Sequence, residues 1–71
     1  MKNNLKKIRG EKDLRQWQVA ESVGISVRHY QALEYGDNVP NVHLAIRVAD
    51  ELGVKDIRDL FPINQENQKA K

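Results

Sequence analysis

Glycine and proline residues divide this chain into short segments, and their positions limit the length of any helix that it can form. Gly24, Gly36 and Gly53 each follow a run in which apolar residues recur three or four positions apart. A glycine at such a place lets a helix end in a left-handed cap. Pro40 stops a helix from continuing into it, and Pro62 stands near the end of the chain. The pattern predicts several short helices rather than a few long ones.

The apolar spacing predicts five helices, at residues 4–12, 16–23, 27–35, 42–52 and 56–61. Ser26 and Asn41 are good N-caps for the helices that follow them. The clearest apolar stripe belongs to the fourth helix and consists of Val42, Ala45, Val48, Ala49 and Leu52. Because no segment alternates apolar and polar residues as a strand does, the expected fold class is all-α.

Length and composition predict one small domain that contains neither disulfides nor a structural metal ion. A chain of 71 residues has room for a single domain. It has no cysteine, which excludes disulfides and fits a reducing cytosol. His29 and His43 lie far apart in sequence, so we expect no structural zinc site. We expect a folded domain over residues 1–63 and a polar, disordered tail over residues 64–71.

The sequence offers no feature typical of a membrane protein or an enzyme. No apolar run approaches the roughly 20 residues that span a bilayer, and the N-terminus lacks the apolar stretch of a signal peptide. There is no glycine-rich phosphate loop, metal-ligand cluster or nucleophile–base pair. So short a chain also has little room for a substrate pocket of ordinary size. We expect a cytoplasmic, non-enzymatic protein without a cofactor, a metal or a small-molecule ligand.

Residues 16–33 carry the most informative pattern. Two short predicted helices are joined by a three-residue turn that begins at Gly24. Ala20 is small where the two helices must approach closely, and Ile25 can fill the space between them. Tyr30 and Leu33 can seat the second helix on the core. This is the pattern of a helix-turn-helix, whose second helix is held out with one face free to enter the major groove of DNA.

Basic side chains gather in the first half of the chain. Residues 1–30 hold seven lysines and arginines against three acidic residues, a balance of +4. The balance is −3 over residues 31–61 and +1 over the last ten residues. Such asymmetry suits a face that meets a polyanion. Taken alone, however, it favours the plainer interpretation that these are solvated helix faces.

Short motifs follow one another in a characteristic order and spacing over residues 3–61. They are Leu5-Lys6-Lys7-Ile8-Arg9, Leu14-x-Gln16-x-x-Val19-Ala20, Gly24-Ile25-Ser26, Leu33-Glu34-x-Gly36, Pro40, Ala49-x-x-Leu52-Gly53-Val54 and Leu60-Phe61. No single motif is specific, but the ordered set resembles the Cro and lambda-repressor-like (XRE-type) helix-turn-helix family. The resemblance implies five helices, with 16–23 and 27–35 as the DNA-reading unit. It also implies a dimer that binds double-stranded DNA at an inverted repeat.

The resemblance implies where the chain meets the bases. Gln16 is expected to meet a phosphate or to buttress a base-contacting side chain, the plainer alternative being helix capping alone. The solvent-facing positions of the recognition helix are Val27, Arg28, Gln31 and Ala32. Arg28 is the best candidate for reading a base, because its guanidinium can span O6 and N7 of guanine. Its plainer alternative is a solvated helix residue. Val27 or Ala32 could touch a thymine methyl group.

Four further residues take supporting roles under the same resemblance. Ser26 and His29 are expected to meet phosphates or flanking bases, although a passive polar residue is the preferred interpretation of His29. The family commonly pairs an arginine of the first helix with a glutamate that ends the third. Here that structural ion pair would join Arg9 to Glu34.

The chain departs from the family pattern at three places. Arg15 stands where a Thr or Ser cap is usual, which loses a cap but offers another phosphate contact. Asp37 occupies a loop that is often basic, so either the loop's backbone amides or Asn38 must replace the usual lysine, or this loop clamps the phosphate only weakly. Trp17 stands where a charged or small residue is common, and we interpret it as a packing residue rather than a DNA contact.

The dimer surface is expected at the last helix, whose apolar residues so small a chain cannot all cover. Its residues are Ile57, Leu60, Phe61 and Ile63. The leading hypothesis is a transcriptional regulator, most simply a repressor. The alternative is a protein-interaction module of the same fold, such as an antitoxin-like or anti-regulator partner, which Asp37 and the acidic second half leave open.

Overall fold

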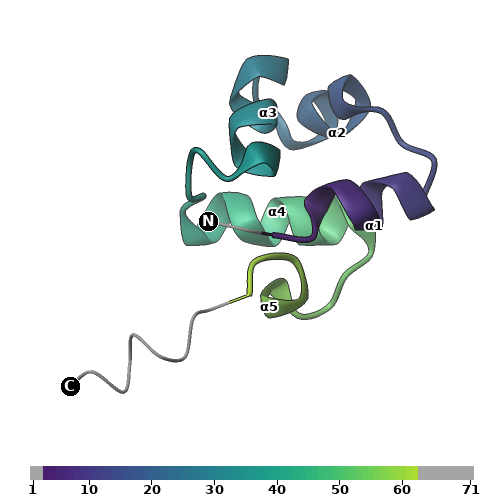
Figure 1. Cartoon of the computed structure of the whole chain (residues 1–71), viewed down its shortest axis with the longest axis vertical. Coiled ribbons are helices and arrows are strands. Elements are labelled where there is room, and N and C mark those ends of the chain that lie inside the picture. Colours follow the sequence, from purple (N-terminus) through teal and green to yellow (C-terminus); the bar gives the residue numbers. More distant parts are fainter. Residues whose placement is uncertain (1–2, 63–71) are drawn as a thin grey trace.

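The computed structural model describes residues 3–62, and all of its regular elements are α-helices (Figure 1). In chain order they are α1 (Leu5–Glu11), α2 (Gln16–Val23), α3 (Val27–Tyr35), α4 (Val42–Leu52) and α5 (Ile57–Leu60). The all-α fold class is confirmed, and the predicted bounds of α2, α3 and α4 are those observed. The first and last helices are each one residue shorter at both ends than predicted. Ile63 and the predicted tail at 64–71 lie outside the described residues.

The core lies around α4. Figure 1 shows α4 crossing the middle of the molecule, with α2 and α3 on one side and α5 on the other. Contacts join α2 to α3, α2 to α4 and α4 to α5. The buried apolar side chains come from all five helices and the residue after α5: Leu5, Val19, Ala20, Val23, Tyr30, Leu33, Ala45, Val48, Ala49, Leu52, Leu60 and Phe61. None of the described helices is long and apolar enough to cross a membrane.

Local caps explain why the helices begin and end where they do. The Ser26 hydroxyl accepts a hydrogen bond from the His29 amide at 3.0 Å, and the Asn41 carbonyl oxygen Oδ1 accepts one from the Leu44 amide at 2.8 Å. These are the two predicted N-caps, and each satisfies an amide that the first helical turn leaves unpaired. Gly24 ends α2 with φ 81°, a left-handed conformation that favours glycine and turns the chain toward α3.

Val42 departs from the predicted apolar stripe of α4. Its side chain is 65% exposed, whereas Ala45, Val48 and Leu52 are buried. The helical angle of Val42 matches the stripe, but a side chain in a first turn is buried only where another element reaches it. None of the described residues packs over Val42 closely enough to bury it. Ile46, one turn further on, is also exposed.

The two ends of the domain are tied together. The backbone amide of Asn4 donates to the carbonyl oxygen of Leu60 at 2.9 Å, and the Asn4 side-chain amide donates to that of Asp59 at 2.7 Å. Asn3 similarly joins the start of α1 to α3, because its Nδ2 donates to the carbonyl oxygen of Leu33 at 2.7 Å. These bonds hold α1 against both α3 and α5.

Candidate nucleic-acid interface

The third helix has one buried face and one exposed face. Tyr30 and Leu33 are fully buried and fix α3 to the core. Val27, Arg28 and His29, in the first turn of the same helix, are exposed. The turn 24–26 places α2 beside α3, and Figure 1 shows the pair together at one end of the molecule. A helix seated in this way can present its exposed face to a groove in another molecule.

The predicted DNA-contacting residues are all at least partly accessible. The exposed ones are Arg15, Ser26, Val27, Arg28, His29 and Asn38, and the half-buried ones are Gln16, Gln31 and Ala32. Arg28 is not covered by the rest of the described chain, which is what a base-reading role requires. Contact of these residues with DNA remains a prediction.

An open hollow of about 340 Å³ lies beside the start of α2 and α3. It is lined by Arg9, Arg15, Gln16, Trp17 and Val27. Trp17, which the sequence favoured as a packing residue, is 52% exposed and is not part of the core. Its ring instead contributes apolar surface next to two arginines. Such a combination suits the sugar and phosphate groups of a nucleic acid strand.

The loop after α3 has fewer free donors than the sequence suggested. The backbone amides of Asp37 and Asn38 both donate to the carbonyl oxygen of Ala32, at 2.9 and 3.2 Å. These two amides are therefore engaged in ending α3. The sequence suggested that either the loop amides or Asn38 would replace the usual lysine as a phosphate contact. Of these, the side chain of Asn38 is exposed.

The start of α2 keeps half of a capping box. The Arg15 guanidinium has no acceptor and so cannot cap the helix. The Gln18 side chain, however, accepts a hydrogen bond from the Arg15 backbone amide at 2.8 Å. Sequence reasoning missed this bond, although a glutamine three residues after the N-cap is its usual signal. The Arg15 side chain is left free to project from the surface.

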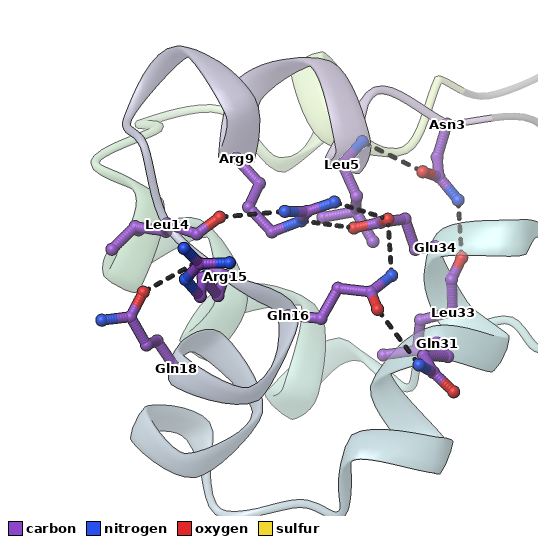
Figure 2. Close-up of polar contacts among 10 residues, drawn as sticks. All are labelled: Asn3, Leu5, Arg9, Leu14, Arg15, Gln16, Gln18, Gln31, Leu33 and Glu34. Carbon is purple, nitrogen blue, oxygen red and sulfur yellow. Dashed lines mark hydrogen bonds and ion pairs between the residues drawn. The ribbon is translucent and has the colours of Figure 1, made fainter.

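Arg9 and Glu34 form the predicted ion pair beneath this surface (Figure 2). The Arg9 Nε and Nη2 atoms donate to the two carboxylate oxygens of Glu34 at 2.8 and 3.0 Å. The third guanidinium nitrogen donates to the carbonyl oxygen of Leu14 at 2.9 Å. The exposed fraction of the Glu34 side chain is 2% and that of Arg9 is 16%. The pair joins α1 to the end of α3.

Two glutamines extend the ion pair toward the exposed surface. The Gln16 Nε2 atom donates to Glu34 at 2.9 Å, and the Gln31 Nε2 atom donates to the Oε1 atom of Gln16 at 3.1 Å. Figure 2 shows Gln16 lying between Glu34 and Gln31. The sequence suggested that Gln16 buttresses another side chain, but nothing in it identified Gln31 as the neighbour.

The same environment shifts three pKa values. Burial alone would raise the pKa of Glu34, but hydrogen bonds from Arg9 and Gln16 outweigh it, and the pKa lies below its ordinary value. The hydrogen bonds to Glu34 also raise the pKa of Arg9. Burial, reinforced by the nearby Glu34 charge, raises the pKa of Tyr30. At neutral pH the ion pair is therefore fully charged.

The expected dimer surface on α5 is partly wrong. Leu60 is fully buried and Phe61 is 8% exposed, because both pack into the core of their own chain. Ile57 is half-buried and packs against the same core. Ile63 lies outside the described residues. Leu60 therefore has no free surface to offer a second molecule, and Phe61 has very little.

An all-α domain whose third helix is seated by a short turn on the second, with its outer face free, is a helix-turn-helix domain. The model of the Helix-turn-helix family matches residues 5–60. The chain belongs to this family of DNA-binding transcriptional regulators. Its match includes every described helix.

Three relatives agree with this family. The chain is 33% identical over 67 residues to an uncharacterized HTH-type transcriptional regulator of Bacillus subtilis, YgzD, covering 94% of this chain and 100% of the relative. It is 35% identical over 69 residues to one of Methanothermobacter thermautotrophicus, covering 97% and 100%. It is 39% identical over 61 residues to one of Methanocaldococcus jannaschii, covering 86% and 91%.

Proposed function

We propose that this protein is a cytoplasmic, sequence-specific transcriptional repressor that binds an inverted-repeat operator as a homodimer, without a small-molecule ligand. The observation that carries the proposal is the division of α3 between a core face at Tyr30 and Leu33 and an exposed face at Val27 and Arg28. Repression is the simplest outcome, since a domain that occupies an operator blocks other proteins from the same duplex.

Phosphate contacts would set the position of the domain on the duplex. Arg15, Ser26, His29 and the side chain of Asn38 are exposed near the two ends of α3 or at the start of α2. The first turn of α2 also carries amides that have no partner within the helix, at the positive end of its dipole. These groups would hold the register of the domain without reading sequence.

Base contacts would then come from the exposed face of α3. Arg28 has the reach and the two-pronged geometry to recognise guanine. Val27 and Ala32 offer methyl groups that can meet the methyl group of thymine. Two such helices in a twofold dimer would read half-sites about 34 Å apart.

The homodimer needs an apolar surface other than Leu60 and Phe61. Four of the six large apolar side chains that are exposed in the described residues fall between residues 35 and 46: Tyr35, Val39, Val42 and Ile46. Val42 and Ile46 are one turn apart on α4, so their side chains share a face. A second copy of α4 packed antiparallel about Val42 and Ile46 would cover both side chains, so we infer that the dimer contact lies here.

Selection from random duplexes tests the function. We expect an inverted repeat to be enriched, and binding of the selected duplex to weaken steeply between low and moderate salt, because phosphate contacts release counterions. A pool without an enriched sequence, or binding that is insensitive to salt, would contradict the proposal.

A protein-interaction module is the second candidate. The observation that favours it is Asp37, an exposed carboxylate in the loop where a phosphate clamp is usual. A protein interface formed through apolar contacts would be far less sensitive to salt than DNA binding. The selection therefore separates the two candidates: a protein-interaction module enriches no duplex, whereas a regulator enriches an operator whose binding weakens steeply with salt.

A further inference from the structure

The exposed ring of Trp17 lies in the hollow at the start of α2 and α3. Trp17 is the only tryptophan of the chain, and it is 52% exposed. The hollow measures about 340 Å³ and is also lined by Val27, the first residue of the recognition helix. A half-exposed indole ring leaves apolar surface in water, which a bound molecule can cover. The hollow therefore presents an apolar wall beside the helix that we expect in the major groove.

Only one of the two arginines in the hollow is available to a ligand. All three guanidinium nitrogens of Arg9 are engaged, two with Glu34 and one with the carbonyl oxygen of Leu14. The Arg15 guanidinium, by contrast, donates to no group that the structure describes, and Arg15 is exposed. The hollow thus combines an aromatic wall with one positive charge that no described group neutralises. One apolar contact beside one anion contact matches a single nucleotide of a nucleic acid backbone.

We propose that the Trp17 ring packs on one deoxyribose of the operator backbone, beside a phosphate held by Arg15, and so makes the domain selective for DNA over RNA at that nucleotide. In a helix-turn-helix complex the first of the two helices crosses the backbone while the second lies in the major groove. The sugar carbons C2′ and C3′ face the major-groove side of B-form DNA, so this apolar edge of the sugar would meet the ring. The inference rests on the proposed DNA-binding function.

The selectivity follows from the atom that the ring covers. Ribose carries a hydroxyl group on C2′, and this group is what allows a protein to tell RNA from DNA. Packed against the face of the indole ring, the hydroxyl would lose water and gain no hydrogen bond, which is unfavourable. A phosphate contact alone would not distinguish the two sugars. Discrimination against ribose at one nucleotide is therefore the specific consequence of the ring contact.

The test places single ribonucleotides in the operator obtained by selection. Each nucleotide of one half-site is replaced in turn, and affinities are measured for the native protein, Trp17→Ala and Trp17→Phe. We expect a ribonucleotide at one backbone position to weaken binding by the native protein about fivefold to a hundredfold. Trp17→Ala should bind the all-DNA operator about tenfold more weakly and lose this ribose penalty. Trp17→Phe retains an aromatic ring and should keep most of the penalty.

Three controls separate the ring contact from other effects. A 2′-fluoro nucleotide favours the same sugar pucker as ribose but has no hydroxyl group, so it should weaken binding much less than ribose does at that position. Arg28→Ala is expected to weaken binding through a base and should keep the full ribose penalty. Thermal unfolding of Trp17→Ala should resemble that of the native protein, because Trp17 is not part of the core.

Fluorescence gives a second measurement on the unmodified operator. Because the chain has a single tryptophan, selectively excited tryptophan emission reports on Trp17 alone. In the free protein the exposed ring should be quenched readily by acrylamide. Binding of the operator should cover the ring and lower the quenching constant severalfold.

The outcomes distinguish this contact from the function on which it rests. If no duplex is enriched, the DNA-binding function itself fails. If a duplex is bound but no ribose penalty depends on Trp17, or if the ring stays open to acrylamide in the complex, the sugar contact is refuted while the regulator remains. A 2′-fluoro nucleotide that weakens binding as much as ribose would also refute it.

Discussion

Arg9 and Glu34 lie 25 residues apart in sequence and meet in a two-pronged ion pair with N–O distances of 2.8 and 3.0 Å. The pair fixes α1 to the end of the recognition helix. It also stands directly beneath the surface that we assign to DNA, since Arg9 lines the hollow there and Glu34 accepts a hydrogen bond from Gln16. The stability of the domain and its proposed recognition of DNA therefore depend on the same buried contact.

Replacing one partner of this ion pair should lower the free energy of unfolding more than replacing both partners. Arg9→Met leaves the Glu34 charge buried without its partner, and we expect a loss of about 3–5 kcal/mol in the free energy of unfolding. Arg9→Met combined with Glu34→Leu should recover most of that loss, because no charge remains unpaired. Urea unfolding of the two single variants and the double variant measures both effects. Additive losses would contradict this account.

Acid should weaken the fold through Glu34. Between its ordinary pKa of 4.5 and its lower pKa in the folded protein, the unfolded chain binds more protons than the folded one. The free energy of unfolding therefore falls as the pH falls through this window, and the contribution is fully present above 4.5. Glu34→Gln should show a smaller fall between neutral pH and about pH 3 than the native protein. Unfolding curves with the same pH slope in both proteins would exclude Glu34 as the cause.

The hydroxyl of Tyr30 is expected to add little to stability. It is buried beside Glu34 and Arg9, which shift its pKa, but it makes no hydrogen bond of ordinary geometry with the residues that the structure describes. Tyr30→Phe keeps the ring that seats α3 and removes a polar atom from the core. We expect the free energy of unfolding to stay the same or to rise by up to about 1 kcal/mol. Thermal unfolding checks this, with Tyr30→Leu as the control that should lose stability. A loss of more than about 1 kcal/mol in Tyr30→Phe would indicate a bond that the structure lacks.

Arg28 should determine one base of the operator. Arg28→Ala is expected to relax the preference at a single position by about 1–3 kcal/mol while leaving the unfolding temperature unchanged. Arg58→Ala is the matched control, because Arg58 is exposed on α5 and pairs with Asp56, away from α2 and α3 (Figure 1). Competition binding with operator variants measures both. A base-preference profile unaltered by Arg28→Ala would remove Arg28 from the reading face.

The proposed dimer contact predicts that a charge placed on α4 halves the mass of the protein in solution. Ile46→Asp places a charge on the exposed face of α4 and should convert a dimer into a monomer in analytical ultracentrifugation. Because two half-sites would then be bound separately, operator binding should weaken and lose its cooperativity. Lys55→Asp, on the connection to α5, is the control that should remain dimeric. If Ile46→Asp stays dimeric, the contact lies elsewhere.

Much of the fold was predictable because its signals are local. Ser26 and Asn41 cap the helices that follow them, and Gly24 adopts the left-handed conformation expected of a terminating glycine. These preferences depend on neighbouring atoms in the chain, so the bounds of the central helices follow from the sequence.

The features that were missed depend on what lies across the molecule. Val42 has the right helical angle for the core, yet only a neighbouring element decides whether it is covered. Phe61 ends a helix too short to hold an exposed dimer face, and it folds back into the core instead. The contact between Gln16 and Gln31 needs the crossing of α2 and α3, which the sequence places side by side without fixing which side chains meet.

The hydrogen bonds from Asn4 to Asp59 and Leu60 have a topological consequence. The start of α1 lies beside the end of α5, so the two ends of the described domain are close together in space. Joining its ends by a short linker and opening it in the loop after α3 would preserve every helix and its neighbours. A gene reordered in this way should still encode the same domain.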